Sequence, residues 1–284
     1  MPRQLDFAKG HGTMNDFVVF ADPEGAFDPS PAEVRFLCDR RAGVGADGVL
    51  RAVPGRFVDG RSGDPHAWFM DYRNADGSLA EMCGNGVRVF LIFLKRAGLV
   101  PDATESLAIG TRAGVRTATY LPDGTVRVWM GRPVLDAPVT VTVGDAGWAA
   151  RAVDVGNPHA VAIVDAPETL AALDLTRMPA WTPVEAFPNG VNLEFVEVLA
   201  PGEVRMRVYE RGVGETHSCG TGTVAVAAAV AAEQGPDAAA SYVVHVPGGR
   251  VRVDLEGADA YLTGPAEIVY TGSIVLPDPE GIHD

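Results

Sequence analysis

Two cysteines stand at the start of apolar segments that the sequence predicts to be helical. The first begins Cys-Gly-Asn-Gly at 83–86, before a run at 87–94 that is apolar on all sides apart from Arg88. The second begins Cys-Gly-Thr-Gly at 219–222, before the apolar run 223–232. The dipole and unpaired N–H groups of a helix N-terminus favour a thiolate and lower the pKa of a cysteine from about 8.5 toward neutral. The pattern therefore predicts two acidified thiols, one in each half of the chain.

Two such thiols suit a reaction that inverts a stereocentre without a cofactor. One thiolate removes a proton from a carbon, and a thiol returns a proton to the opposite face, so two acid/base groups in opposite protonation states are the minimum. The N–H groups of a helix N-terminus also stabilise a substrate carboxylate as negative charge builds on it. A single nucleophilic cysteine would not require the duplication.

Several other interpretations of the two cysteines stay open at this point. Each cysteine taken alone fits a core position, which is the commoner fate of this residue. A dithiol redox pair normally shows close sequence spacing, which is absent here. A cysteine hydrolase would use His159 or His217, but the sequence offers no partner to orient either ring. A non-catalytic amino-acid-binding module would need at least one cysteine replaced.

The elements around the two cysteines repeat. In the first half, short strands flank a Gly-rich loop at 9–16, a capping box at Ser30 opens a helix, and strands at 49–53 and 68–72 precede the first Cys motif. In the second half, strands flank the loop 156–159 and a strand at 205–209 precedes the second motif. A helix that is apolar all round must be buried. We therefore expect two similar α/β (α+β) domains related by a pseudo-twofold axis, each with a buried helix inside a wrap of strands, and with both helix N-termini at the cleft between them.

The same pattern gives the expected boundaries. The first domain covers 1–131, the second begins at 132, strands at 242–246, 250–255 and 266–276 close the structure, and 277–284 forms a frayed tail.

Composition excludes several classes of protein. The chain has 284 residues, a net charge of −14 and three cysteines, and no Cys-x-x-Cys pair. The negative charge argues against a nucleic-acid partner, because phosphate neutralisation needs a basic face. The sparse cysteines argue against a disulfide framework and structural zinc, and Cys38 on one face of the 30s helix reads as an inert core thiol. We see no membrane span or signal peptide, and expect a cytoplasmic protein without metal.

The motifs together resemble the diaminopimelate epimerase family, in order and over nearly the whole chain. The matching segments are His11-Gly12 with Asn15-Asp16-Phe17, 74–78 with 80–86, 156–159, 188–192, and 210–216 with 219–222. The two Cys motifs are specific in combination, whereas either Cys-Gly-x-Gly alone is weak.

The resemblance implies an isomerase that interconverts LL- and meso-diaminopimelate without pyridoxal phosphate or metal, in lysine and peptidoglycan precursor biosynthesis. It implies two pseudo-symmetric domains, each a mixed sheet curled around a central helix, with a strand at about 266–276 returning to the first domain, 1–131, and with 132–265 as the second. It also implies a homodimer in which Cys83 and Cys219 are the acid/base pair, modulated by His159 and Glu210. The substrate-binding residues that it implies are Asn15, Asn74, Gly84, Asn85, Asn157, Asn192, Glu210, Arg211, Gly220 and Thr221.

The chain departs from the family pattern at a few positions. Gly48 stands where many members have Gln, Met14 stands where Gly is common, and His217 lies close enough to Cys219 to shift its pKa. The alternative within the same fold is a proline or hydroxyproline racemase-like enzyme, which also uses two cysteines. Such an enzyme is not expected to carry the set Asn15, Asn157, Asn192 and Arg211, which suits a second amino-acid head group.

Overall fold

The computed structural model describes residues 3–59, 64, 67–164 and 166–277. Contacts divide the chain into two compact units, the first built from residues 1–128 and 265–284 and the second from 129–264. The expected tail at 277–284 lies outside the described residues apart from Pro277.

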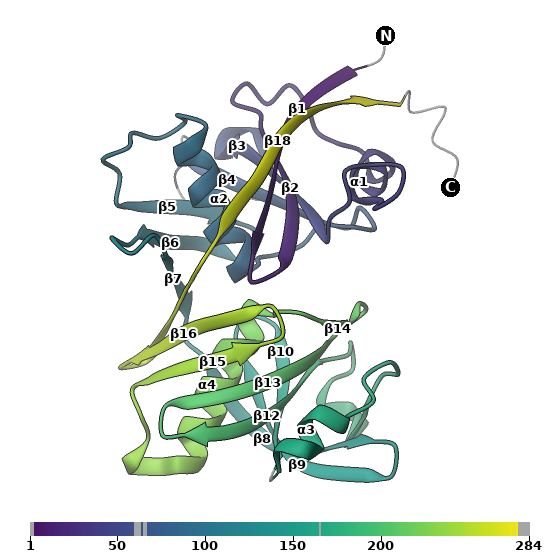
Figure 1. The fold of residues 1–284 in the computed structure, drawn as a ribbon, viewed down its shortest axis with the longest axis vertical. Coiled ribbons are helices and arrows are strands. Elements are labelled where there is room, and N and C mark those ends of the chain that lie inside the picture. Colours follow the sequence, from purple (N-terminus) through teal and green to yellow (C-terminus); the bar gives the residue numbers. More distant parts are fainter. Residues whose placement is uncertain (1–2, 60–63, 65–66, 165, 278–284) are drawn as a thin grey trace. The chain divides into compact units, whose positions relative to one another are not determined.

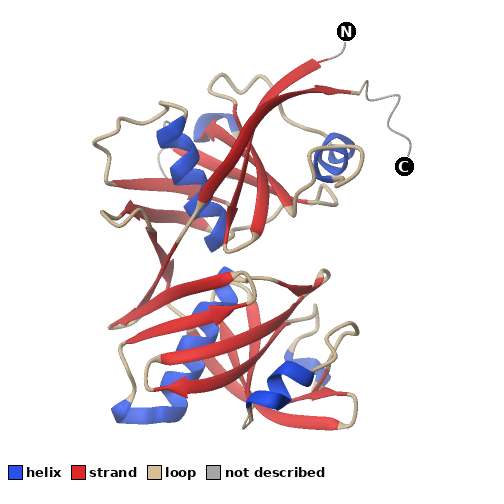
Figure 2. Ribbon diagram, viewed as in Figure 1, coloured by secondary structure: helices blue, strands red, loops and turns tan. Residues whose placement is uncertain are grey.

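The first unit is a mixed sheet with two helices (Figures 1 and 2). Its strands pair in the order β18-β1-β2-β3-β4-β5-β6-β7, and the β2–β3 and β4–β5 pairs are parallel. Its elements are β1 (Arg3–Gly12), β2 (Asn15–Ala21), α1 (Pro31–Cys38), β3 (Gly48–Pro54), η1 (Gly55–Phe57), β4 (Trp68–Asn74), α2 (Gly84–Arg96), β5 (Ser106–Thr111), β6 (Gly114–Tyr120), β7 (Val126–Gly131) and β18 (Glu267–Leu276).

The second unit repeats this plan (Figure 2). Its strands pair in the order β8-β9-β10-β12-β13-β15-β16-β17, with β10–β12 and β13–β15 parallel. Its elements are β8 (Val134–Val143), β9 (Ala146–Asp154), β10 (Pro158–Ile163), α3 (Pro167–Ala172), β11 (Ala180–Thr182), η2 (Val184–Ala186), β12 (Asn192–Ala200), β13 (Glu203–Glu210), β14 (Gly214–Thr216), α4 (Gly220–Gln234), η3 (Gly235–Asp237), β15 (Ser241–Val246), β16 (Gly249–Glu256) and β17 (Asp259–Gly264).

The two pairing orders match strand for strand, with α1 and α3 in the first parallel crossover and α2 and α4 in the second. A parallel pair needs such a crossover, and a helix usually supplies it. The expected fold class, two pseudo-symmetric halves with a mixed sheet curled around a central helix, is confirmed.

The sheets curl because each unit buries one helix on every side. Residues 84–94 of α2 and 220–230 of α4 are all buried. Glycines let strands approach α2, since a Cβ added at Gly10 would lie 2.8 Å from the side chain of Val89. In the second unit, α4 is rich in alanine, and its residues 220–230 are all buried.

The predicted helix starts are confirmed, and several strands were missed. Ser30 caps α1 through a capping box in which the Ser30 and Glu33 side chains each bind the other's backbone N–H. The sequence did not predict β8, β11, β14 or β17, and β9 begins well before the short strand expected next to the loop 156–159. The strands β11 and β14 have three residues each and are too short to show a period. The strands β8 and β17 do alternate, at Val139 and Val141 and at Ala260 and Leu262, and were overlooked.

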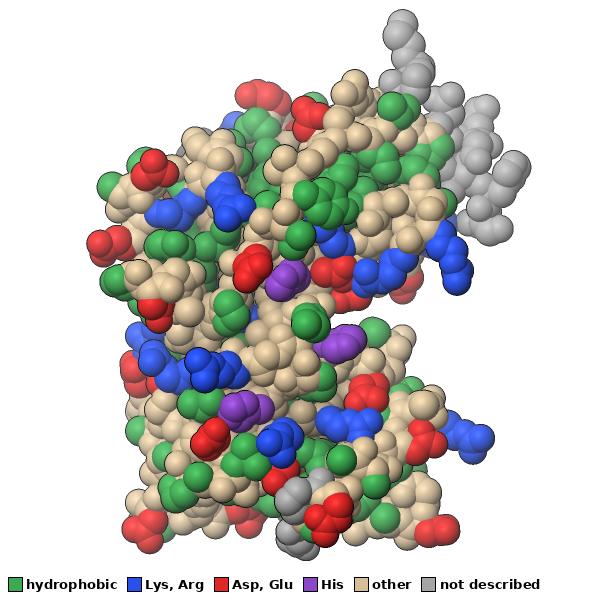
Figure 3. Space-filling model, viewed as in Figure 1, with side chains coloured by type: hydrophobic (Ala, Val, Ile, Leu, Met, Phe, Trp, Pro, Cys, Tyr) green, Lys and Arg blue, Asp and Glu red, His purple; other side chains and the backbone are tan. Residues whose placement is uncertain are grey.

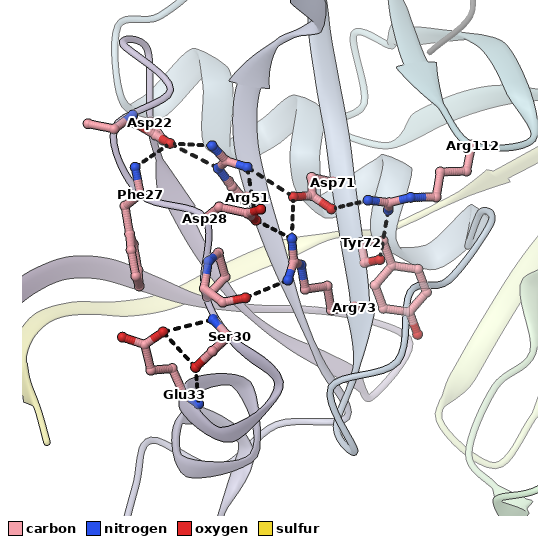
Figure 4. Close-up of polar contacts among 12 residues, drawn as sticks. Asp22, Phe27, Asp28, Ser30, Glu33, Arg51, Asp71, Tyr72, Arg73 and Arg112 are labelled. Carbon is pink, nitrogen blue, oxygen red and sulfur yellow. Dashed lines mark hydrogen bonds and ion pairs between the residues drawn. The ribbon is translucent and has the colours of Figure 1, made fainter. Parts of the chain in front are cut away.

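A buried ion network joins β3 and β4 to the loop that leads into α1 (Figure 4). Asp71 accepts hydrogen bonds from Arg51 at 3.3 Å, Arg73 at 3.2 Å and Arg112 at 2.6 Å. Arg112 also donates to the backbone oxygen of Tyr72. Burial by itself raises the pKa of Asp71, but Arg73 and Arg112 outweigh it and hold this pKa below its usual value. The network thereby fixes the end of β4, from which the chain continues toward Cys83.

We expect Asp71→Ala to lower the free energy of unfolding by about 3–5 kcal/mol, because it leaves buried guanidinium groups without their shared carboxylate. Urea unfolding at neutral pH measures this change. The control is Glu233→Ala, which removes an exposed partner of Arg151 and should cost about 0–1 kcal/mol.

The difference in the free energy of unfolding between the parent and Asp71→Ala should shrink in acid. Because the folded-state pKa of Asp71 is lowered, its contribution is present above the unfolded value of about 3.9 and disappears as the pH falls through the folded value. A gap between parent and variant that stays constant or widens in acid would contradict the assignment.

Candidate active site

Cys83 is the N-cap residue of α2 and is partly exposed. Its sulfur accepts from the backbone N–H of Gly86 at 3.5 Å and, as a thiol, donates to Oδ1 of Asn15 at 3.4 Å. Asn85 Nδ2 donates to the same Asn15 oxygen at 3.3 Å. The first unit therefore brings together Cys83, Asn85 and Asn15 around one amide oxygen.

Asn15 is held in one orientation by a charged cluster. Its Nδ2 donates to Asp47 at 2.9 Å, and because a carboxylate only accepts, Oδ1 must face Cys83. Arg40 binds both Asp16 and Asp47. Asp16 is partly buried, which favours its neutral form, but hydrogen bonds from Arg40 and Lys9 hold the pKa of this carboxyl well below its usual range. The sequence prediction missed Arg40 and Asp47, which do not touch the cysteine.

The turn before Asn15 explains one departure from the family pattern. Thr13 and Met14 connect β1 to β2 with φ values of 50° and 64°. A two-residue hairpin turn of this type needs positive φ at both positions, which glycine adopts at least cost. Met14 therefore holds a conformation for which glycine is the easier residue.

Asn74 and Gly48 lie opposite one another at the ends of β4 and β3. The Asn74 side chain donates to the hydroxyl of Ser78 at 3.0 Å and closes the loop that follows. A Cβ added at Gly48 would lie 2.6 Å from the backbone oxygen of Arg73. The close approach of β4 therefore excludes a larger residue at this departure from the family.

Cys219 is the N-cap residue of α4 and ends a chain of polar contacts in the second unit. Its sulfur lies 3.5 Å from Oγ1 of Thr221, which accepts from Nδ2 of Asn157 at 3.2 Å. Oδ1 of Asn157 lies 3.0 Å from Nε2 of His159, and Nδ1 of His159 lies 2.7 Å from Glu194. The chain of contacts links a buried carboxylate to the second cysteine.

Glu194 is the main residue that the sequence prediction missed. Parallel pairing of β10 with β12 sets His159 opposite Asn192, which places Glu194 beside the imidazole, with both side chains fully buried. A Cβ added at Gly222 would lie 2.6 Å from Oε1 of Glu194, so the carboxylate also reaches the first turn of α4. The available signal was a glutamate at an inward position of an apolar strand, since such a residue is seldom buried without a partner.

The environment of Cys219 is unfavourable to a thiolate. Burial raises the pKa of Cys219 well above its usual value, and the charges of Glu210 and Glu194 raise it further, against smaller opposing effects of Thr221 and the Gly222 N–H. The expectation that the helix N-terminus acidifies this thiol is wrong, because burial and two carboxylates outweigh the helix end. His217 is exposed and is not among the groups that shift this pKa.

The remaining predicted residues of the second unit lie near the polar contacts of Cys219. Asn192 accepts from the backbone N–H of Arg211 at 2.9 Å and donates to the backbone oxygen of Pro158 at 3.2 Å. Glu210 accepts from the hydroxyl of Thr216. The guanidinium of Arg211 is exposed. Gly220 opens α4 beside the cysteine.

Cys38 lies in the core beside Val34 and Leu37, and burial raises its pKa to about 12, so it is an unreactive thiol. Within the described ranges, no group of three His, Cys, Asp or Glu side chains is placed to hold a metal ion. None of the helices described is both long enough and apolar enough to span a membrane.

Comparison with known sequences gives a full-length match. The family model for diaminopimelate epimerase matches residues 7–135 and 151–269. A diaminopimelate epimerase of Streptomyces coelicolor is 49% identical over 291 residues, which cover 99% of each chain. One of Corynebacterium glutamicum is 47% identical over 276 residues, covering 96% of this chain and 99% of the relative.

Solved structures at low identity share the fold. A hydroxyproline epimerase from Agrobacterium vitis superposes with a TM-score of 0.70 at 17% identity, covering 99% of this chain and 95% of that one. A PhzF-family phenazine biosynthesis protein from Bacillus anthracis superposes with a TM-score of 0.70 at 14% identity, covering 96% and 99%.

We expect Glu194→Gln to lower the pH at which Cys219 ionises by about one unit, because it removes a negative charge that opposes the thiolate. The rate of iodoacetamide alkylation against pH measures this midpoint in a Cys38→Ala/Cys83→Ala background, where Cys219 is the remaining thiol. The matched control is Glu197→Gln on the same strand, which loses a contact with Arg205 and should leave the midpoint unchanged. A midpoint that rises or stays constant in Glu194→Gln would refute the assigned role.

Proposed function

The chain belongs to the diaminopimelate epimerase family and is an isomerase, and on this premise we propose that it interconverts LL- and meso-diaminopimelate by proton transfer at one α-carbon, with Cys83 and Cys219 as the two acid/base groups. The reaction needs no cofactor, because the thiols themselves carry the proton. It takes place in the cytoplasm and supplies precursors of lysine and peptidoglycan.

The observation that carries the proposal is the repeated N-cap. Each unit ends one loop in a cysteine at the N-cap position of a helix whose residues are buried from 84 to 94 in α2 and from 220 to 230 in α4. An inversion needs one group to take a proton from one face of the carbon and another to give a proton to the opposite face. The raised pKa of Cys219 keeps it a thiol at neutral pH, which suits the proton donor.

The remaining assignments follow the chemistry of the substrate. The backbone N–H groups at Gly84-Asn85 and Gly220-Thr221 stabilise the reacting carboxylate as charge builds on it. Glu210 binds the α-ammonium group, Arg211 with Asn15, Asn157 and Asn192 binds the second amino-acid head group, and Asn74 is a further substrate-binding residue. His159 and Glu210 modulate the thiols.

A proline or hydroxyproline racemase-like activity is the second candidate, favoured by the shared fold alone. The set formed by Arg211 with Asn15, Asn157 and Asn192 argues for the longer, doubly zwitterionic substrate. The test therefore presents both substrates.

We expect the purified chain to incorporate deuterium at one α-carbon of LL-diaminopimelate in heavy water and to form the meso isomer without added cofactor. Proton NMR measures the exchange and chiral chromatography the isomer. Exchange of proline instead would favour the second candidate, and no α-exchange in either substrate would reject the proposal.

The cysteine variants test the mechanism separately. Cys83→Ala and Cys219→Ala should each abolish epimerisation, whereas Cys38→Ala, which changes a core thiol, should retain it. Full epimerisation by either of the first two variants would refute the two-thiol scheme.

We further propose that the protein is a homodimer that pairs through β18. This strand runs along β1 and leaves Val269, Tyr270 and Val275 about half exposed. Hydrophobic side chains gather over β18 and β1 on the face shown in Figure 3. A long apolar edge strand is a template for pairing with another chain, and natural proteins usually cover it.

Light scattering should give twice the chain mass for the parent and a single chain mass for Val269→Lys/Val275→Lys, because lysine on an edge strand opposes pairing. Val184→Lys changes an equally exposed valine in η2 and should remain dimeric. A monomeric parent would reject this part of the proposal.

A further inference from the structure

Arg88 is a fully buried cation in the middle of the apolar helix α2. Its Nη2 donates to Oδ1 of Asn85 and, at 3.2 Å, to Oγ1 of Thr13. Its Nε and Nη1 have no hydrogen-bond partner among the described residues, and no carboxylate there pairs with it. A buried guanidinium without a carboxylate is costly, so its presence calls for a reason.

The charge of Arg88 persists at neutral pH and acts on Cys83. Burial lowers the pKa of Arg88 to about 10, and the negative charge of the Cys83 thiolate raises it in part. Coupling between two ionisable groups is reciprocal, so the Arg88 charge favours the Cys83 thiolate to the same extent.

The contacts of the Cys83 sulfur disfavour its thiolate unless a positive charge lies nearby. As a thiol, Cys83 donates to Oδ1 of Asn15, and Asp47 fixes that oxygen in place. Loss of the thiol proton leaves a negative sulfur 3.4 Å from an oxygen that cannot turn away. The Gly86 N–H offsets part of this repulsion, and a full positive charge offsets far more.

The matched strand order shows that the two units differ in charge at equivalent positions. Parallel pairing sets Phe17 opposite Gly48 in the first unit and His159 opposite Asn192 in the second. Two residues further along β3 and β12, Leu50 is therefore the counterpart of Glu194. Both reach the second glycine of the Cys motif, since an added Cβ would lie 3.5 Å from Leu50 at Gly86 and 2.6 Å from Glu194 at Gly222.

On the two helices, the charged residue stands in the first unit and the apolar residue in the second. Five residues after the cysteine stands Arg88 in α2 and buried Val224 in α4. The first unit thus places a cation and an apolar residue around its cysteine, and the second places an apolar residue and a carboxylate.

No other charged group of the described residues near α2 cancels the positive charge of Arg88. Gly10 and Gly12 of β1 face the helix, so Lys9 and His11 point to the other side of the sheet. Glu267 of β18 lies opposite His11 and is exposed.

On the neighbouring strands too, successive side chains point alternately toward α2 and toward the far side of the sheet. Phe17, Leu50 and Tyr72 lie on the helix side, which turns the charged residues beside them to the far side. Those charged residues are Asp16, Arg51, Asp71 and Arg73. Arg116 of β6 is buried on the same face as Ala118, and Glu81 in the preceding loop is exposed. The buried charges on the Cys83 side of the sheet are therefore cationic.

We infer that Arg88 makes Cys83 the thiolate of the resting enzyme, and that this buried cation, absent from the second unit, decides which cysteine begins as base. The inference deepens the proposed function and rests on it for its catalytic meaning. Arg88 is a positioning residue, because it acts on the substrate only through Cys83 and Asn85.

The test measures alkylation of Cys83 by iodoacetamide against pH in a Cys38→Ala/Cys219→Ala background, without substrate. Arg88→Met keeps the length of the side chain and removes the charge, and Arg88→Gln is a second neutral variant that keeps a polar end. We expect either variant to raise the midpoint by about one unit or more, which slows alkylation at neutral pH about tenfold. Arg88→Lys restores the charge and should return the midpoint toward that of the parent.

A purely structural role predicts a different pattern. The control Arg96→Met lies on the same helix, loses a contact with the backbone oxygen of Ile268, and should leave the midpoint unchanged. In the otherwise intact chain, Arg88→Met should also move the acid limb of the kcat/KM profile to higher pH. Equal midpoints in the folded neutral variants, Arg88→Lys and the parent would overturn the inference.

The alkylation result is independent of the proposed reaction. Failure of the intact chain to exchange an α-proton would reject the function and would leave the Cys83 midpoint as it was measured.

Discussion

Each unit depends on one constraint, a helix that is apolar all round and must be covered on every side. A single flat sheet covers one face of a helix, so the strands must curl, and glycines such as Gly10 let them approach. The wrapped helix leaves its N-terminal N–H groups without intrahelical partners, and a cysteine occupies the N-cap position in both units, with its sulfur bonded to a backbone N–H in α2. Fold and candidate chemistry therefore arise from the same burial.

Duplication of this plan produced two cysteines whose surroundings differ. In the second unit, burial with Glu194 and Glu210 disfavours the Cys219 thiolate, and the contacts through His159 and Asn157 hold the carboxylate in place. In the first unit, the counterpart of Glu194 is Leu50 and the buried charge is that of Arg88. A reaction that needs one thiol and one thiolate is served by this difference, because identical surroundings would favour the same protonation state at both sites.

Much of the fold and part of the site could be predicted from residue types at short spacing. The capping box at Ser30, the two buried helices and the strands beside them follow from local patterns, and the family resemblance drawn from the motifs is confirmed by the full-length matches. The strands β11 and β14 were missed because they are too short to show a period, whereas β8 and β17 carry alternating apolar residues that were overlooked. The expected acidic character of Cys219 was wrong, because burial of the thiol, with the charges of Glu210 and of Glu194 on β12, outweighs the local effect of the helix N-terminus.

By itself, the sequence determined where the helices begin and which cysteines stand at their N-cap positions, since each of these is encoded within a few neighbouring residues. It also showed the internal repeat, because the same short motif recurs in the second half. Only the tertiary structure decided which side chains surround each sulfur. Glu194 reaches Cys219 through the parallel register of β10 and β12, and the clustering of Arg51, Arg73 and Arg112 on Asp71 spans β3, β4 and the chain beyond β5. The physical reason is that burial and Coulomb interactions act through space, between residues whose separation along the chain carries no trace of their contact.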